Sequence, residues 1–233
     1  MRTAAESAPV TTPPRSWWWG FALFTTVSLV HVVALGLGTD AIAAPTKLAL
    51  MPALAVAALW AGRGSGWGTP YTALFLALAL SWLGDGAGAF FPDAPTVPVM
   101  LLCFGLAHLV YIWLFARPLA LRRLPAWSLV YAAWWVALLL ILWPHLGGLA
   151  IPVAAYGLVL GGTAAAAARC GPVIATGGAF FLVSDTVLAF RLFLPEAMPG
   201  EASPVVMLTY CLGQGLLVAG VVRHPASRRE ATR

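Results

Sequence analysis

Long apolar stretches dominate this sequence and leave little room for anything else. Hydrophobic residues make up 61% of the chain and charged residues only 9%, whereas an ordinary soluble domain has about 25% charged residues. Because one helix needs about 20 residues to cross a bilayer, a chain of 233 residues has room for about eight crossings with short loops. The sequence therefore predicts an all-α, polytopic membrane protein without a soluble domain.

Eight predicted spans cover residues 17–37, 45–61, 70–91, 98–116, 125–143, 147–168, 172–194 and 203–222. They form one membrane domain, residues 17–222, between a polar N-terminal tail (1–16) and a basic C-terminal tail (223–233). Prolines such as Pro45, Pro70 and Pro144 fall near the predicted span ends. This position suits a residue that begins a helix well and interrupts one badly. We expect a bundle of eight transmembrane helices in the cell membrane.

The charged residues alternate in sign between successive loops. Basic residues precede span one and follow the even-numbered spans: Arg2, Arg15, Arg63, Arg117, Arg122, Arg123, Arg169, Arg223, Arg228, Arg229 and Arg233. The opposite loops carry only acidic charge: Asp40, Asp93, Glu196 and Glu201. Because basic loops face the cytoplasm, both termini are expected there, in agreement with an even number of spans. This topology also explains the net charge of +5 without a nucleic-acid partner.

Two aspartates lie inside apolar spans. Asp85 ends the stretch Ser-Trp-Leu-Gly-Asp, and Asp185 ends the stretch Phe-Leu-Val-Ser-Asp. A carboxylate at such a depth costs at least ~2.5 kcal/mol. Counting 1.5 Å per residue from the inner ends of their spans places both at roughly 21–22 Å within a ~30 Å slab. An intramembrane carboxylate is by default a candidate functional group.

Other polar residues share the outer half of the membrane with the aspartates. The same count places His31, His108, Tyr156 and Tyr210 close to their depth, and Lys47 and Arg191 near the outer boundary. Structural explanations stay open for each: Lys47 and Arg191 can reach the surface, and His31 can be a hydrogen-bonded interior histidine. His108 and Tyr111 share one helix face, as do Tyr210 and Gln214, so structural hydrogen bonds and catalytic roles both fit.

Short motifs in this layer resemble the YhhN-like lysoplasmalogenase family. They are Leu-Gly-Asp at 83–85, Phe-Gly-Leu-Ala-His-Leu-Val-Tyr at 104–111, Thr-Lys at 46–47, Tyr156, Ser-Asp at 184–185, and Tyr210 with Gln214. The resemblance extends over roughly residues 25–222. The chain departs from the family at Leu48, where proline is more frequent, and in the glycines that follow Asp85.

This resemblance implies an enzyme that hydrolyses the vinyl ether bond of lysoplasmalogens. The products are a fatty aldehyde and a glycerophospho-ethanolamine or -choline. It implies Asp85 and Asp185 as catalytic residues, with substrate-binding or orienting roles for Lys47, His108, Tyr111, Tyr156, Ser184, Tyr210 and Gln214. No cofactor or metal is expected. The expected partners are a lysophospholipid substrate and the bilayer, and the oligomeric state stays open.

Two carboxyl groups suit vinyl ether chemistry. The slow step protonates the β-carbon and leaves an oxocarbenium ion, so the reaction needs a protonated acid and a nearby anion. Glycosidases meet a related oxocarbenium problem with paired carboxyl groups. The sequence leaves open which aspartate is the acid. It also leaves open whether Asp85 and Asp185 lie close enough to share a substrate.

Three other functions compete with this interpretation. A proton-coupled transporter also places carboxylates within the membrane. A zinc-dependent membrane hydrolase is disfavoured, because only His31 and His108 lie clearly within spans, with His145 at an edge. No two of the three cysteines form a close pair in sequence, so their spacing does not favour a disulfide or a zinc cluster. A non-enzymatic membrane scaffold or receptor is the third alternative.

Overall fold

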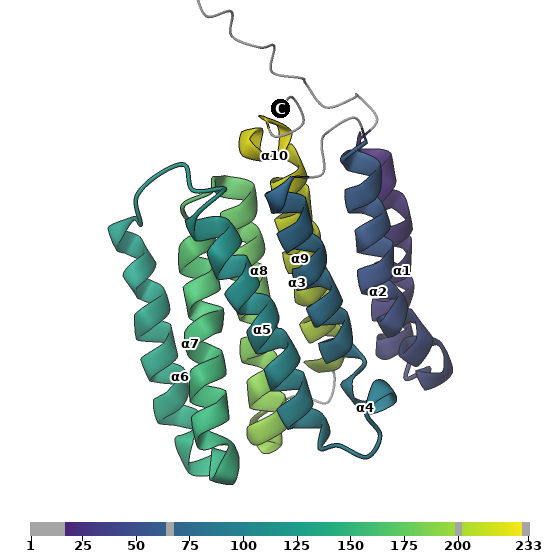
Figure 1. The fold of residues 1–233 in the computed structure, drawn as a ribbon. Coiled ribbons are helices and arrows are strands. Elements are labelled where there is room, and N and C mark those ends of the chain that lie inside the picture. The colour runs from purple at the N-terminus through teal and green to yellow at the C-terminus, as the bar shows by residue number, and fades with distance from the viewer. Residues whose placement is uncertain (1–16, 64–67, 199–201, 230–233) are drawn as a thin grey trace, which may run out of the picture.

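The computed structural model describes residues 17–63, 68–198 and 202–229. These form long helices joined by short connections (Figure 1). Eight of the helices have 16 to 22 residues: α1 (Phe21–Gly36), α2 (Asp40–Ala61), α3 (Thr69–Asp85), α5 (Thr96–Ala116), α6 (Val130–Leu146), α7 (Ala150–Ala167), α8 (Pro172–Phe193) and α9 (Ala202–Arg223). The described residues contain no strand, so the all-α prediction is confirmed. The predicted N-terminal tail, Glu201 and Arg233 lie outside the described residues.

Six segments of the described chain are long and apolar enough to cross a membrane. One of them, Ala126–Ala167, contains both α6 and α7, which are joined by the short 3₁₀ turn Gly147–Leu149. Helix α3, with 17 residues, is shorter than any of the six. The chain is therefore a multi-pass membrane protein.

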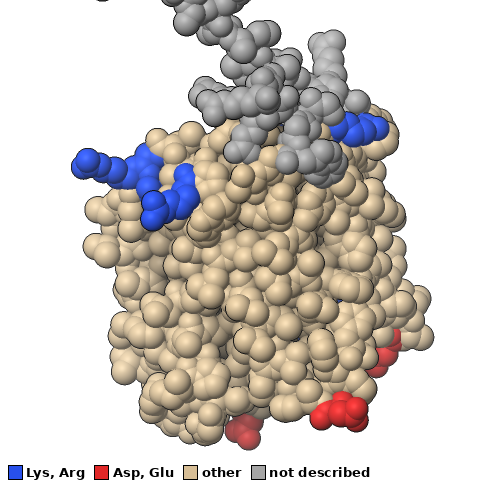
Figure 2. Space-filling view, viewed as in Figure 1, with Lys and Arg blue, Asp and Glu red and all other residues tan. Residues whose placement is uncertain are grey.

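Charge is separated between the two ends of the bundle. Figure 2 shows Lys and Arg at one end and Asp and Glu at the other, with a broad uncharged band between them. Arg63 follows α2 and Arg169 follows α7 at the basic end, whereas Asp40 begins α2 and Glu196 follows α8 at the acidic end. The bundle thus carries the alternation of loop charge that the sequence predicts.

Prolines lie inside two helices rather than at their ends. Helix α2 begins at Asp40 and contains Pro45 and Pro52, so the predicted start of the second span at residue 45 was wrong. Pro144 likewise lies inside α6. Membrane helices tolerate such prolines because neighbouring helices and local adjustments of the turn satisfy the freed carbonyl groups.

The predicted third span is broken next to its aspartate. Helix α3 ends at Asp85, and the single-turn helix α4 (Ala87–Phe90) follows Gly86. A Cβ atom on Gly86 would meet the ring of Phe90, so a larger residue at position 86 would require that ring to move. The continuous span 70–91 was therefore wrong, and exposed Gly88 does not pair with Gly84 as a helix-packing motif.

The tightest helix pair is α8 against α9. A Cβ atom on Gly177 would lie 2.8 Å from the backbone nitrogen of Leu217, and one on Gly213 would lie 2.8 Å from that of Phe181. These two glycines let the backbones approach, which is how membrane helices pack without a hydrophobic drive between them. The close approach fixes the side chains of α8 and α9 that face the bundle interior.

Part of the predicted C-terminal tail is folded. The short helix α10 (Pro225–Arg229) follows α9 and contacts α3 (Figure 1). His224 and Ser227 are 5% and 1% exposed. Residues 225–229 of the predicted basic tail are thus helical.

Candidate active site

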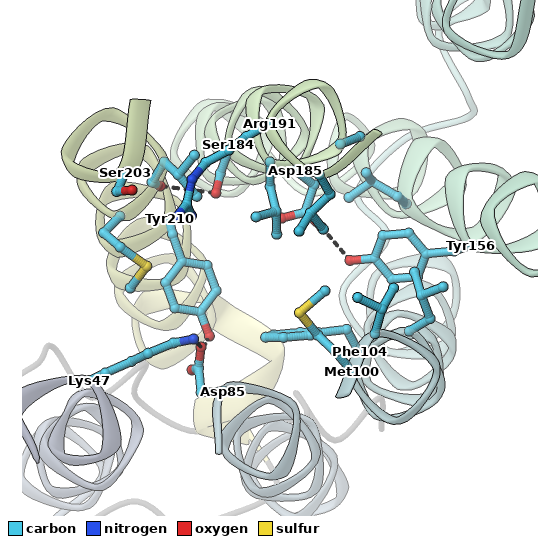
Figure 3. A pocket seen from close by; sticks show the side chains of 18 of the residues that line it. Lys47, Asp85, Met100, Phe104, Tyr156, Ser184, Asp185, Arg191, Ser203 and Tyr210 are labelled. Carbon is cyan, nitrogen blue, oxygen red and sulfur yellow. Dashed lines mark hydrogen bonds and ion pairs between the residues drawn. The ribbon is translucent and has the colours of Figure 1, made fainter. Parts of the chain in front are cut away.

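A cavity of about 400 Å³ lies within the bundle. Side chains from all eight long helices line it, and Figure 3 shows the helices arranged around it. Asp85 and Asp185 lie on opposite sides of this cavity (Figure 3). The structure thus brings both aspartates to one space, although they lie one hundred residues apart in the sequence.

Asp85 is held by a hydroxyl donor and a cation. The Tyr210 hydroxyl donates a hydrogen bond of 2.7 Å to Oδ2, and the Lys47 ammonium lies 4.0 Å from Oδ1. The Asp85 side chain is only 4% exposed, against 38% for that of Lys47. Because Asp85 is the last residue of α3, the helix dipole disfavours a negative charge there. Tyr210 and Lys47 offset that effect.

Aromatic packing fixes the ring of Tyr210. The ring meets Phe104 and Phe181 edge-on, with centroids 6.0 Å and 5.4 Å away. Phe104 also lies over Gly84, where an added Cβ atom would come within 2.6 Å of the Phe104 ring. Gly84 therefore lets α3 approach α5 one residue before the aspartate, and the same phenyl ring supports Tyr210.

Asp185 has different neighbours. The Tyr156 hydroxyl donates a hydrogen bond to Oδ2 (Figure 3), and the Nε2 atom of His108 lies 4.0 Å from the same oxygen. Among the described residues, Asp185 forms no ion pair with a lysine or arginine. Arg191 therefore does not neutralise Asp185.

A chain of hydrogen bonds leads away from Asp185. The Tyr156 hydroxyl lies 3.4 Å from Nε2 of His108, and Nδ1 of His108 lies 3.1 Å from the Thr163 hydroxyl. Thr163 in turn donates to the carbonyl of Val159 at 3.0 Å. His108 is fully buried and stands behind Tyr156. Nothing in the sequence singles out Thr163, which lies in a run of small residues.

A second buried hydrogen-bond network lies one helical turn before Asp85 along α3. Tyr111 donates to Oε1 of Gln214 at 2.8 Å, and the Gln214 amide nitrogen donates to the Ser81 hydroxyl at 3.2 Å. Ser81 precedes Asp85 by four residues and Gln214 follows Tyr210 by four, so this network fixes the register of α3 against α9. Tyr111 and Gln214 do not line the cavity, and any orienting role acts through their neighbours.

The remaining predicted site residues differ in how available their side chains are to a ligand. Ser184 lines the cavity, but its hydroxyl donates to the carbonyl of Val206 at 3.0 Å, so it joins α8 to α9. Among the described residues, one lysine and one arginine line the cavity: Lys47 and Arg191. Arg191 is exposed and is available to an anionic ligand.

The cavity wall is chemically asymmetric. Helices α1 and α2 contribute His31, Asp40 and Lys47, and α8 contributes Asp185 and Arg191, whereas Leu138 of α6 and Val153 of α7 form an apolar part of the wall. An elongated amphipathic molecule matches such a wall. Among the described residues, no three His, Cys, Asp or Glu side chains lie close enough together to hold a metal ion.

Comparison with known proteins agrees with these features. A model of the YhhN family matches residues 42–221. Lysoplasmalogenase TMEM86B of Rattus norvegicus is 35% identical over 169 residues, which cover 72% of this chain and 68% of the relative. Lysoplasmalogenase TMEM86B of Homo sapiens is 34% identical over 183 residues, which cover 77% of this chain and 76% of the relative. No solved structure matches the chain. The family resemblance carried by the motifs is therefore confirmed, and the chain belongs to the YhhN family.

Proposed function

We propose that this protein is a membrane-embedded lysoplasmalogenase that hydrolyses the vinyl ether bond by catalysis from Asp185 and Asp85. The observation that carries the proposal is the placement of these two carboxyl groups in one cavity (Figure 3), each with a tyrosine donor. Relatives of this chain named lysoplasmalogenases support the substrate class. The asymmetric cavity wall supports an amphipathic substrate with one chain.

The proposed topology has eight crossings with both termini in the cytoplasm. Eight helices of 16 to 22 residues and the segregation of charge in Figure 2 support it, because basic loops face the cytoplasm. In this orientation Asp40 and Glu196 mark the outer face. The cavity then opens in the outer half of the membrane, near the level of the lipid headgroups.

Asp85 is assigned the role of the stabilising anion. The Lys47 ammonium at 4.0 Å and the Tyr210 hydrogen bond at 2.7 Å both stabilise a negative charge on it. A carboxylate held in this way faces the cavity where an oxocarbenium ion would form. It would also accept a proton from the water molecule that attacks this ion.

Asp185 is assigned the role of the acid. Thr163 donates its proton to a backbone carbonyl, so the Thr163 oxygen accepts a hydrogen bond from Nδ1 of His108. In the fold Tyr156 donates to Asp185, as it would to a carboxylate. When Asp185 is protonated and His108 is neutral, Tyr156 instead donates to Nε2 of His108, 3.4 Å away, and accepts from the Asp185 hydroxyl. Every donor in this chain has one acceptor. When Asp185 has given its proton to the substrate, the Tyr156 hydroxyl donates to the resulting carboxylate, as in the fold.

The reaction balances with these two groups alone. Asp185 transfers its proton to the β-carbon, and the α-carbon becomes the oxocarbenium ion. Water adds to that carbon and gives a proton to Asp85, so that the substrate becomes a hemiacetal. The hemiacetal hydroxyl returns a proton to Asp185 as the carbon–oxygen bond breaks, and Asp85 protonates the departing glycerol oxygen. A fatty aldehyde and a glycerophospho-alcohol leave, and both aspartates return to their starting states.

Substrate orientation follows from the wall of the cavity. Lys47 and Arg191 supply positive charge for the phosphate, and the apolar side near Leu138 and Val153 accommodates the start of the alkenyl chain. A cavity of about 400 Å³ is too small for a complete long-chain lipid, so the rest of the chain extends between helices into the bilayer.

The test compares two substrates and two variants. Purified protein should release aldehyde from a lysoplasmalogen and none from the matching ester lysolipid. Asp85→Asn and Asp185→Asn should insert and fold normally and release no aldehyde. Full activity in either variant would refute the assignment. Substrate flux into reconstituted vesicles without breakdown would instead favour a proton-coupled transporter.

A further inference from the structure

His31 has one ring nitrogen bonded and one unpartnered. It lies on α1, is 1% exposed and lines the cavity. Its Nδ1 atom lies 3.0 Å from the Thr46 hydroxyl of α2, whereas Nε2 has no hydrogen-bond partner among the described residues. Only half of the hydrogen-bonding capacity of this histidine therefore serves the fold.

The geometry around Thr46 assigns the ring proton. Its hydroxyl donates to the carbonyl of Ile42 at 2.6 Å and lies 3.1 Å from that of Ala43. A carbonyl can only accept, and a threonine hydroxyl has one proton. The Thr46 oxygen must therefore accept a hydrogen bond from Nδ1–H of His31. In the neutral ring, Nε2 is left with a lone pair and no donor.

An unpartnered acceptor in a cavity wall is a position for a ligand donor. Buried polar groups almost always have a partner, and each exception calls for an explanation. The wall around His31 also includes Asp40 and Lys47 of α2. The α1 and α2 part of the wall thus carries several polar side chains.

We infer that Nε2 of His31 accepts a hydrogen bond from the polar part of a bound lysophospholipid. The choice of ligand rests on the proposed function. The donor is an O–H or N–H group, and a lysophospholipid offers two: the free hydroxyl of its glycerol and the ammonium of an ethanolamine headgroup. Acylation removes the first donor and replacement of ethanolamine by choline removes the second. His31 thus selects either the lyso form or the ethanolamine headgroup.

Binding of non-hydrolysable ligands tests this subsite separately from catalysis. Saturated 1-alkyl ether lysophospholipids carry the same polar groups but no vinyl ether. Four of them combine an ethanolamine or choline headgroup with a free or an O-methylated glycerol hydroxyl. The full-length wild-type protein should bind the ligands without the recognised donor about tenfold more weakly. The pair that differs identifies which donor His31 reads.

Three variants complete the test. His31→Phe should bind all four ligands equally, at the weaker affinity, whereas His31→Gln keeps an acceptor and should retain part of the preference. Ser28→Ala, a buried position on the same helix outside the cavity wall, should behave as the wild type.

Equal wild-type affinity for all four ligands, or a preference that survives in His31→Phe, would overturn the inference. Failure to hydrolyse a lysoplasmalogen would refute the proposed function alone, because none of these ligands needs to react.

Discussion

Removal of the Tyr210 hydroxyl isolates one contact of Asp85. In Tyr210→Phe the ring keeps its edge-on contacts with Phe104 and Phe181, at 6.0 Å and 5.4 Å between centroids. The hydrogen bond of 2.7 Å to Oδ2 of Asp85 is lost. Because the change removes a single oxygen atom, it should not disturb the aromatic packing between α5, α8 and α9.

The expected loss follows from the strength of that bond. A hydrogen bond to a charged group contributes about 1.5–3 kcal/mol, and about 1.4 kcal/mol corresponds to a factor of ten in rate. Since Lys47 stays 4.0 Å from the other carboxylate oxygen, Asp85 keeps part of its stabilisation. We therefore expect kcat/KM to fall by about 10- to 150-fold in Tyr210→Phe.

The assay is the initial rate of aldehyde release from a lysoplasmalogen. Tyr131→Phe, on α6 and outside the cavity wall, is the matched control and should keep wild-type activity. Wild-type activity in Tyr210→Phe, or a loss of the same size in Tyr131→Phe, would refute this role.

Two further predictions concern the hydrogen-bond chain and the helix packing. Tyr156→Phe should lower kcat about 100-fold and change the pH profile of the reaction. Thr163→Val, two contacts farther from the cavity, should change kcat and the pH profile less. Equal effects of the two variants would contradict a role for this hydrogen-bond chain. Gly177→Ala should lower the free energy of unfolding by about 1–3 kcal/mol, because the new Cβ atom would lie 2.8 Å from the Leu217 nitrogen. Gly148→Ala, with nothing within 4 Å, should leave thermal stability unchanged, and equal melting temperatures for the two variants would contradict the packing argument.

Hydropathy and charge predicted much of the fold because both depend on local sequence. The apolar stretches became long helices, and the loops kept their charge alternation. Helix ends were less predictable: Pro45 suggested a start, yet α2 begins at Asp40 because tertiary contacts compensate for the proline. The third span was predicted as continuous to residue 91, but α3 ends at Asp85 and the single-turn helix α4 follows Gly86.

Depth along the predicted spans anticipated part of the candidate site. Counting residues placed Asp85, Asp185, Tyr156 and Tyr210 in one layer, and all four line the cavity. Which aspartate meets a cation could not be predicted, because the neighbours of each come from helices distant in the sequence. Lys47 on α2 pairs with Asp85 on α3, whereas Asp185 meets a tyrosine from α7.

Residues that act through others left no signal in the sequence. Thr163 and Ser81 are small polar residues among alanines, glycines and leucines, and such residues usually serve helix packing. Their hydrogen bonds join helices 55 and 133 residues apart in the chain. The sequence favours a structural role for His31 over a functional one, and only the partners of its two nitrogens separate those roles.

The isotope content of the released aldehyde tests carbon protonation most directly. Wild-type protein should be incubated with a lysoplasmalogen in deuterated water, and the aldehyde trapped as it forms and analysed by mass spectrometry. Proton transfer from Asp185 to the β-carbon predicts one deuterium on the carbon next to the carbonyl, delivered to a single face. Aldehyde released without deuterium at that carbon would contradict acid catalysis by the aspartate pair.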